Sequence, residues 1–217
     1  MNVLFDHGRA ERIGLPESVF CEGKPFEALA HLALEHTKPA ARPILFTRLS
    51  PDVFARLPAE AASRLNYHPL SRTAFNRTLP ERAVGKAAVV SAGTSDGPTT
   101  WEAARTLAYL GISHTVYEDS GVAGIWRLTE RLEEINAHQV VIVAAGMDAA
   151  LASVLGGLTP RPIIAVPTAV GYGVAAGGET ALHSMLASCA PGVAVMNIGN
   201  GYGAACAASR ILSLLNA

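Results

Sequence analysis

The sequence has few charged residues and no long apolar run. Of its 217 residues, 16% are Asp, Glu, Lys or Arg, and the 17 basic side chains almost balance the 18 acidic ones. Without a cluster of Lys and Arg, the chain lacks the electrostatic footprint of a nucleic-acid-binding protein. It also lacks the run of about 20 apolar residues that a membrane-spanning helix needs, and the apolar stretch of a signal peptide. We therefore expect a cytoplasmic protein with neither nucleic acid nor membrane as partner.

Cysteine is also scarce. Cys21, Cys189 and Cys206 are an odd number of thiols at wide spacings, which fits neither a disulfide framework nor a zinc site. Pro191 keeps Ala190 out of helical geometry and so predicts that Cys189 lies at a helix end. By itself this thiol is either a small buried hydrophobe or a reactive group. Cys206 lies in an alanine-rich segment that predicts helix packing.

What the sequence does contain is a regular alternation of apolar runs and helical segments. Half of the residues are apolar, which predicts a compact protein and, together with the low charge, a homo-oligomer. The continuous apolar runs suit a parallel sheet covered by helices on both faces. We therefore predict a doubly wound α/β domain over residues 83–217, with ligands bound at the carboxyl ends of its strands. The predicted strands are 86–91, 112–117, 139–144, 162–166 and 193–197.

Residues 1–82 have a different pattern and predict a small amino-terminal α/β domain. A helix is expected over 25–37 and a strand over 43–47. Another helix is expected to begin at Ser50-Pro51-Asp52, where Ser can cap the helix and Pro fits its first turn.

Two glycine-containing segments follow predicted strands and have two interpretations each. Gly93-Thr94-Ser95-Asp96 opens a helix, so its backbone N–H groups either bind phosphate or only belong to a well-capped helix. Gly171-Tyr172-Gly173 begins a glycine-rich stretch that is either a flexible ligand-covering loop or a segment of small residues that permits close packing between subunits.

Taken together, the motifs resemble the LarB family over nearly the whole chain. Its core is similar to the PurE-like, flavodoxin-like fold of aminoimidazole ribonucleotide carboxylase. The motifs that carry the resemblance are Arg9-x-x-Arg12-x-Gly14-x-Pro16-Glu17, Gly93-Thr94-Ser95-Asp96, Gly121-Val122-Ala123-Gly124-Ile125, Val143-x-Ala145-Gly146-Met147, Val166-Pro167-Thr168-x-Val170-Gly171-Tyr172-Gly173 and Ser188-Cys189-Ala190-Pro191-Gly192.

The resemblance implies an enzyme of nickel-pincer cofactor synthesis, which serves the maturation of lactate racemase. Its substrates would be nicotinic acid adenine dinucleotide and carbon dioxide or bicarbonate, and it would release AMP and pyridinium-3,5-biscarboxylic acid mononucleotide. Magnesium and an octameric assembly are implied as well.

The same resemblance implies roles for particular residues. Cys189 would be the covalent nucleophile, and Asp119 would have a polar role in catalysis. Ser95 and Asp96 would hold the phosphate or ribose of the nucleotide. The remaining residues implied in substrate binding are Gly93, Thr94, Gly146, Met147, Gly171, Tyr172 and Gly173.

Two other functions remain open from the sequence. One is the aminoimidazole ribonucleotide carboxylase or mutase of purine synthesis, although the catalytic His-Leu-Pro-Gly loop of those enzymes is replaced here by Ala150-Leu151-Ala152-Ser153. The other is a non-catalytic nucleotide-binding regulator. The sequence does not indicate the base that activates Cys189, the base that removes the ring proton or the magnesium ligands.

Overall fold

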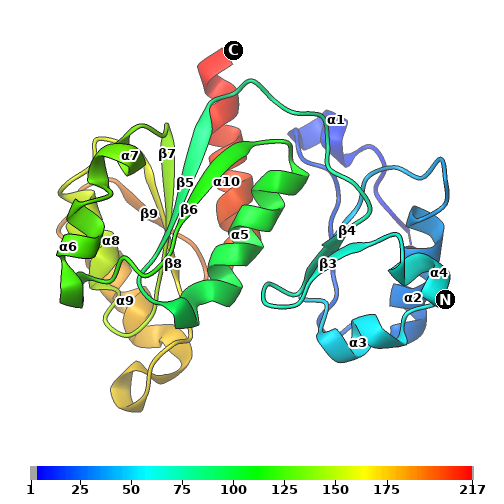
Figure 1. Ribbon diagram of the computed structural model, residues 1–217, viewed down its shortest axis with the longest axis horizontal. Coiled ribbons are helices and arrows are strands. Elements are labelled where there is room, and N and C mark those ends of the chain that lie inside the picture. The colour runs from blue at the N-terminus through cyan, green and yellow to red at the C-terminus, as the bar shows by residue number, and fades with distance from the viewer. Residues whose placement is uncertain (1–3, 217) are drawn as a thin grey trace. The chain divides into compact units, whose positions relative to one another are not determined.

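The computed structural model describes residues 4–216, and the chain divides into two compact units between Pro80 and Glu81 (Figure 1). In the amino-terminal unit, a four-stranded sheet has the order β1-β2-β4-β3, in which β1 is parallel to β2 and the other two pairs are antiparallel. Its strands are β1 (Val19–Phe20), β2 (Leu45–Thr47), β3 (Asn66–His68) and β4 (Thr73–Phe75), and its helices are α1 (Arg9–Ile13), α2 (Phe26–His36), α3 (Pro51–Arg56) and α4 (Ala59–Ala62).

The carboxyl-terminal unit has a fully parallel five-stranded sheet in the order β6-β5-β7-β8-β9. The predicted doubly wound α/β fold is therefore confirmed. The strands are β5 (Lys86–Ser91), β6 (Ser113–Tyr117), β7 (Val140–Ala145), β8 (Ile163–Pro167) and β9 (Val193–Val195). The helices are α5 (Gly97–Tyr109), α6 (Trp126–Thr129), α7 (Leu132–Asn136), α8 (Ala150–Gly156), α9 (Glu179–Leu186) and α10 (Gly201–Ser213).

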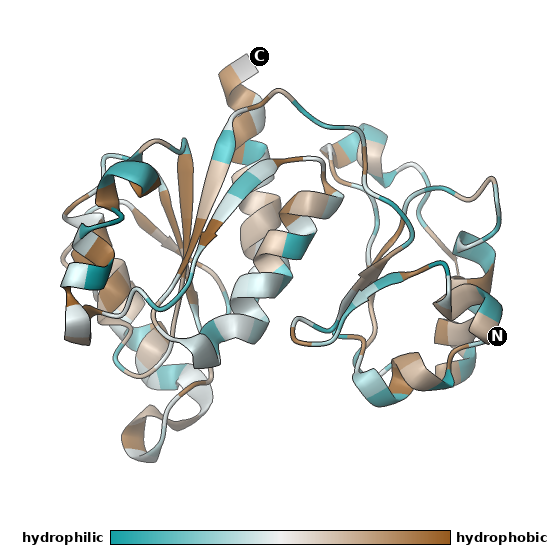
Figure 2. Ribbon diagram, in the orientation of Figure 1, coloured by the Kyte–Doolittle hydropathy of each residue, from teal (hydrophilic) through white to brown (hydrophobic). Residues whose placement is uncertain are grey.

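The sheet is the centre of the hydrophobic core. Every residue of β7 is buried, and so is every residue of β5 after Lys86. Helices α5 and α10 pack together on one face, while α8 and α9 lie on the other with α6 and α7 (Figure 1). Strands covered on both faces cannot alternate polar with apolar residues, which explains the continuous apolar runs of the sequence. Figure 2 shows β7 in the brown of high hydropathy.

The strand order creates a crevice between the adjacent strands β5 and β7. From β5 the chain turns into α5 on one face, and from its neighbour β7 it turns into α8 on the opposite face. The two connections therefore diverge at the carboxyl ends of adjacent strands, where open α/β sheets bind their ligands. Every helix within residues 4–216 is too short or too polar to cross a bilayer.

Candidate active site

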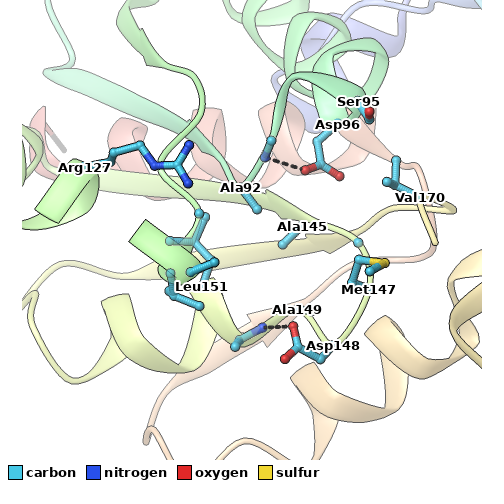
Figure 3. Close-up of a pocket in the computed structure, with 16 residues that line it drawn as sticks. Ala92, Ser95, Asp96, Arg127, Ala145, Met147, Asp148, Ala149, Leu151 and Val170 are labelled. Atoms are coloured by element: carbon cyan, nitrogen blue, oxygen red, sulfur yellow. Dashed lines mark hydrogen bonds between the residues drawn. The ribbon is translucent and has the colours of Figure 1, made fainter. Parts of the chain in front are cut away.

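A cavity of about 550 Å³ opens at this crevice. Four turns line it, each following the carboxyl end of a strand (Figure 3). Most of its wall is apolar, and the polar contributions come from Ser95, Asp96, Arg127 and Asp148. The full lining is Ala92, Gly93, Ser95, Asp96, Gly121, Val122, Ala123, Arg127, Ala145, Gly146, Met147, Asp148, Ala149, Ala150, Leu151 and Val170.

Asp96 ties two of these turns together. Its carboxylate accepts a hydrogen bond from the Gly93 N–H at 2.8 Å and another from the Thr168 hydroxyl at 2.6 Å. The side chain is buried, and burial raises the pKa of Asp96 above its ordinary value even though both hydrogen bonds lower it. Asp96 does not cap α5 through its side chain. The carboxylate therefore organises the floor of the pocket, whereas Ser95 is exposed at the start of the helix.

The turn after β7 is held in a strained conformation. Met147 and Ala149 have φ values of 56° and 53°, in the left-handed region that side chains with a Cβ disfavour. The Met147 N–H donates to the Val170 carbonyl at 2.7 Å. A Cβ on Gly146 would lie 2.4 Å from that same carbonyl oxygen. Gly146 is therefore required where these two protein segments meet, and it also lines the pocket.

Arg127 is the only positively charged residue among the described residues that line the pocket. It follows the turn after β6, and its Nη1 lies 2.7 Å from Oδ2 of Asp119. Asp119 is itself in the left-handed region, with φ of 54°. Asp119 does not line the cavity, and it is joined to a lining residue by this ion pair.

Of the binding residues implied by sequence, the structure brings Gly93, Ser95, Asp96, Gly146 and Met147 into the wall of one pocket. The others do not line it. Thr94 belongs to the same short 3-10 turn as Ser95, and the loop from Gly171 to Gly173 contributes only its preceding residue, Val170. Tyr172 is 78% exposed.

Cys189 is exposed on the turn between α9 and β9. Its neighbour Ser188 shares a 2.7 Å hydrogen bond with Ser153 of α8, which fixes the turn. Val193 pairs with Ile163, the first residue of β8. The turn therefore lies at the amino ends of the strands, and within one chain the thiol and the pocket lie at opposite ends of the sheet.

The other two thiols have different surroundings. Burial raises the pKa of Cys21 to about 12, so this thiol stays protonated near neutral pH. Cys206 is half-buried within α10, the helix that the alanine-rich segment predicts.

Sequence reasoning missed Arg127, Asp148 and the bond from Thr168 to Asp96. Arg127 comes two residues after the Gly121–Ile125 motif and is the first basic residue after β6. This position could have marked Arg127 as a site residue from the sequence. Only the fold shows that its side chain lines the cavity.

Two family models match successive parts of the chain. The model described as the LarB/PurE-like N-terminal domain matches residues 2–78, and the model described as AIR carboxylase matches residues 86–217. An uncharacterized protein of Methanocaldococcus jannaschii is 33% identical over 97% of this chain and 84% of its own length. A crystal structure of Treponema denticola PurE2, a variant with one substitution, is 22% identical, covering 59% of this chain and 80% of that one, with a TM-score of 0.48. The chain belongs to the LarB family, with a PurE-like core of the AIR carboxylase type.

Proposed function

We propose that this protein carboxylates the pyridinium ring of nicotinic acid adenine dinucleotide and hydrolyses its phosphoanhydride. The products are AMP and pyridinium-3,5-biscarboxylic acid mononucleotide, the precursor of a nickel-pincer cofactor. The observation that carries the proposal is the composition of the pocket. An apolar wall suits a flat ring, a single guanidinium suits a carboxylate, and the start of the 13-residue helix α5 suits a phosphate.

A thiolate solves the chemical problem of this reaction. The pyridinium ring is electrophilic, so its C5 carbon cannot attack carbon dioxide directly. When the Cys189 thiolate adds to a ring carbon next to C5, a C–S bond forms and the ring becomes a dihydropyridine. The electron pair of the enamine then forms a C–C bond from C5 to carbon dioxide. Loss of the C5 proton and cleavage of the C–S bond restore the aromatic ring and the free thiolate. Water finally cleaves the phosphoanhydride.

The proposal requires two copies of the chain for each active site. Because the Cys189 thiol and the pocket lie at opposite ends of the sheet, the thiol that enters a pocket belongs to a second subunit. The thiol is exposed, as this arrangement demands. A homo-oligomer, with an octamer as the implied form, is therefore part of the proposal.

Magnesium enters the proposal only as an ion carried by the substrate. Residues 4–216 contain no group of three His, Cys, Asp or Glu side chains able to hold a metal. In the pocket, both oxygens of Asp96 already accept hydrogen bonds, which leaves Asp148 as the available carboxylate. Magnesium commonly binds through substrate phosphates and one or two carboxylates, so we assign no catalytic step to it.

The second candidate is carboxylation in purine synthesis, which the AIR carboxylase match favours. Two observations count against it. None of the described residues that line the pocket is a histidine. Where the purine enzymes have their catalytic His-Leu-Pro-Gly loop, this chain has a segment that begins with Ala150 and Leu151. A nucleotide-binding regulator is the alternative without chemistry, and it predicts binding without turnover.

The test is a Cys189→Ser variant of the full-length protein. With nicotinic acid adenine dinucleotide and bicarbonate, the parent should release AMP and the biscarboxylated product, detected by mass spectrometry. The variant should lose at least about 10³-fold in rate, because a hydroxyl is far less nucleophilic than a thiolate near neutral pH. Cys206→Ser is the matched control and should remain within about threefold of the parent, since Cys206 lies in helix α10. A folded Cys189→Ser variant that carboxylates at the parental rate would exclude covalent catalysis by this thiol.

A further inference from the structure

Two glycines of the preceding turn direct the Arg127 side chain to the pocket. Gly121 lets its segment press against the end of β5, since a Cβ there would lie 2.7 Å from the Ala92 carbonyl oxygen. Gly124 leaves space for the guanidinium, because a Cβ there would lie 2.9 Å from Arg127 Nε. Figure 3 shows the guanidinium reaching in from the α6 side toward Ala92 and Leu151. The Arg127 side chain is 29% exposed, so it is half-buried at the pocket rather than free in solvent.

Asp119 holds this guanidinium in place and leaves part of it available. The ion pair brings Nη1 to 2.7 Å from Asp119 Oδ2, and a guanidinium has five N–H donors in a planar fork. Asp119 adopts its left-handed backbone at an energetic cost, and such strain persists where the surrounding structure determines it. The Asp119 side chain is 50% exposed. The next backbone N–H, of Ser120, donates to the Ser91 carbonyl at 2.9 Å and helps to hold this turn.

The surroundings of Arg127 favour a ring carboxylate over a phosphate. The same pocket wall includes Val122, Ala123 and Leu151, whose side chains offer a flat aromatic ring an apolar surface and offer a phosphate no side-chain donor. The exposed start of α5, at Ser95, is the other electropositive part of the wall. A nucleotide whose phosphates lie toward α5 would place its ring toward Arg127.

We propose that Arg127 binds the carboxylate of the pyridine ring and thereby selects the acid form of the dinucleotide over the amide form. Asp119 is the residue that positions it. A carboxylate accepts two hydrogen bonds from the guanidinium fork, whereas a carboxamide presents an NH₂ group to a side chain that has no acceptor. This inference depends on the proposed function, because it concerns the recognition of that substrate.

The experiment compares two dinucleotides that differ only at this group. Isothermal titration calorimetry on the full-length protein measures the affinity for nicotinic acid adenine dinucleotide and for NAD. The parent should prefer the acid by at least about tenfold, the effect of one charge-assisted contact. Arg127→Gln should weaken acid binding about 10- to 100-fold and leave NAD binding within about threefold, which removes the preference. Arg127→Lys should restore part of it, because the charge remains and the fork is lost.

Two further variants test the role of the ion pair. Asp119→Asn keeps a residue that tolerates the left-handed backbone but frees the guanidinium. It should reduce the acid preference less than Arg127→Gln does, and raise KM with little change in kcat. Arg56→Gln is the control, since Arg56 lies in α3 of the amino-terminal unit, with its guanidinium carbon 4.2 Å from the centre of the Phe26 ring, and the pocket is lined by residues of the other unit. It should leave both affinities unchanged.

Several outcomes would overturn the inference. Equal loss of both ligands in a folded Arg127→Gln variant would show that Arg127 binds the diphosphate. Equal binding of acid and amide by the parent, or binding of neither, would show that no selection takes place here. If the acid preference depends on Arg127 but the parent forms no carboxylated product, the recognition inference stands and the proposed carboxylation fails.

Discussion

Among single residues, Asp96 is the one whose role in the structure differs most from the role that the sequence implies. The resemblance implies contact with nucleotide phosphate or ribose, yet both carboxylate oxygens accept hydrogen bonds from Gly93 and Thr168. We infer that Asp96 serves the site mainly by holding the turn after β5 against the turn after β8.

Replacement of Asp96 should therefore affect stability according to which hydrogen bonds survive. Asp96→Ala leaves the half-buried Gly93 N–H and the buried Thr168 hydroxyl without their acceptor and should lower the free energy of unfolding by about 3 kcal/mol. Asp96→Asn can keep both contacts, because its amide oxygen accepts from Gly93 and its NH₂ donates to Thr168. It should change stability by less than about 1 kcal/mol. Urea denaturation measures both values. Equal destabilisation by the two substitutions would contradict this explanation.

The raised pKa of Asp96 predicts how the difference in stability between the parent and Asp96→Asn changes with pH. Because the folded protein binds the proton more tightly than the unfolded chain does, the contribution of Asp96 to stability decreases as pH rises from 3.8 through the folded-state value. The decrease is complete above that value. Asp96→Asn has no such proton, so its stability relative to the parent should be more favourable at about pH 7 than at about pH 4. A difference that is independent of pH would contradict the assigned shift.

The sequence predicts which segments line the site better than it predicts the contacts that each residue makes there. A glycine-containing turn after a strand predicts a ligand site because parallel strands align their carboxyl ends, and Gly93, Ser95 and Gly146 indeed line one pocket. The contacts of Arg127 depend on the path of residues 118–127, and no periodicity encodes that path. The distance of Cys189 from the pocket likewise depends on the register of β9, which only the assembled sheet defines.

At the scale of elements, sequence reasoning succeeded where apolar residues are continuous. The five predicted strands match β5 to β9, because burial on both faces leaves a strong signal. In the amino-terminal unit, α2 and β2 were predicted and Ser50 caps α3 through its hydroxyl. The antiparallel pair β3–β4 was not predicted. These strands have three residues each, too few to show a period, and β3 contains no buried residue.

The junction between the turns after β7 and β8 gives a prediction at this scale. Gly146→Ala places a Cβ within 2.7 Å of both the Val170 carbonyl oxygen and the Thr168 hydroxyl, so the two turns must separate. We expect a loss of about 2 kcal/mol in unfolding free energy and weaker nucleotide binding. Gly157→Ala is the matched control. It lies at the end of α8 with φ of −86° and its Cβ would meet nothing closer than 3.5 Å, so stability should change by less than about 1 kcal/mol. Thermal unfolding and calorimetry measure both effects, and a fully stable Gly146→Ala protein would refute the assigned contact.

At the scale of the whole molecule, each of the two compact units is matched by its own family model. The chain divides between Pro80 and Glu81, while the family models cover residues 2–78 and 86–217. Each unit has its own buried cluster, centred on Leu29 and Phe46 in the first and on β5 and β7 in the second. The pocket belongs entirely to the second unit.

The proposed sharing of an active site between subunits can be tested by complementation. If a pocket of one copy works with the Cys189 thiol of another, a Cys189→Ser subunit still offers an intact pocket, and an Arg127→Glu subunit still offers an intact thiol. Each variant alone should be inactive. When the two are mixed in equal amounts, denatured and refolded together, random assembly should pair an intact pocket with an intact thiol at about a quarter of the sites, and carboxylation should recover to about that fraction of the parental rate. Refolding each variant alone is the control, and light scattering should show the same oligomer throughout. If the mixed protein assembles but stays inactive, the thiol and the pocket must act within one chain, and the turn carrying Cys189 would have to move across the sheet.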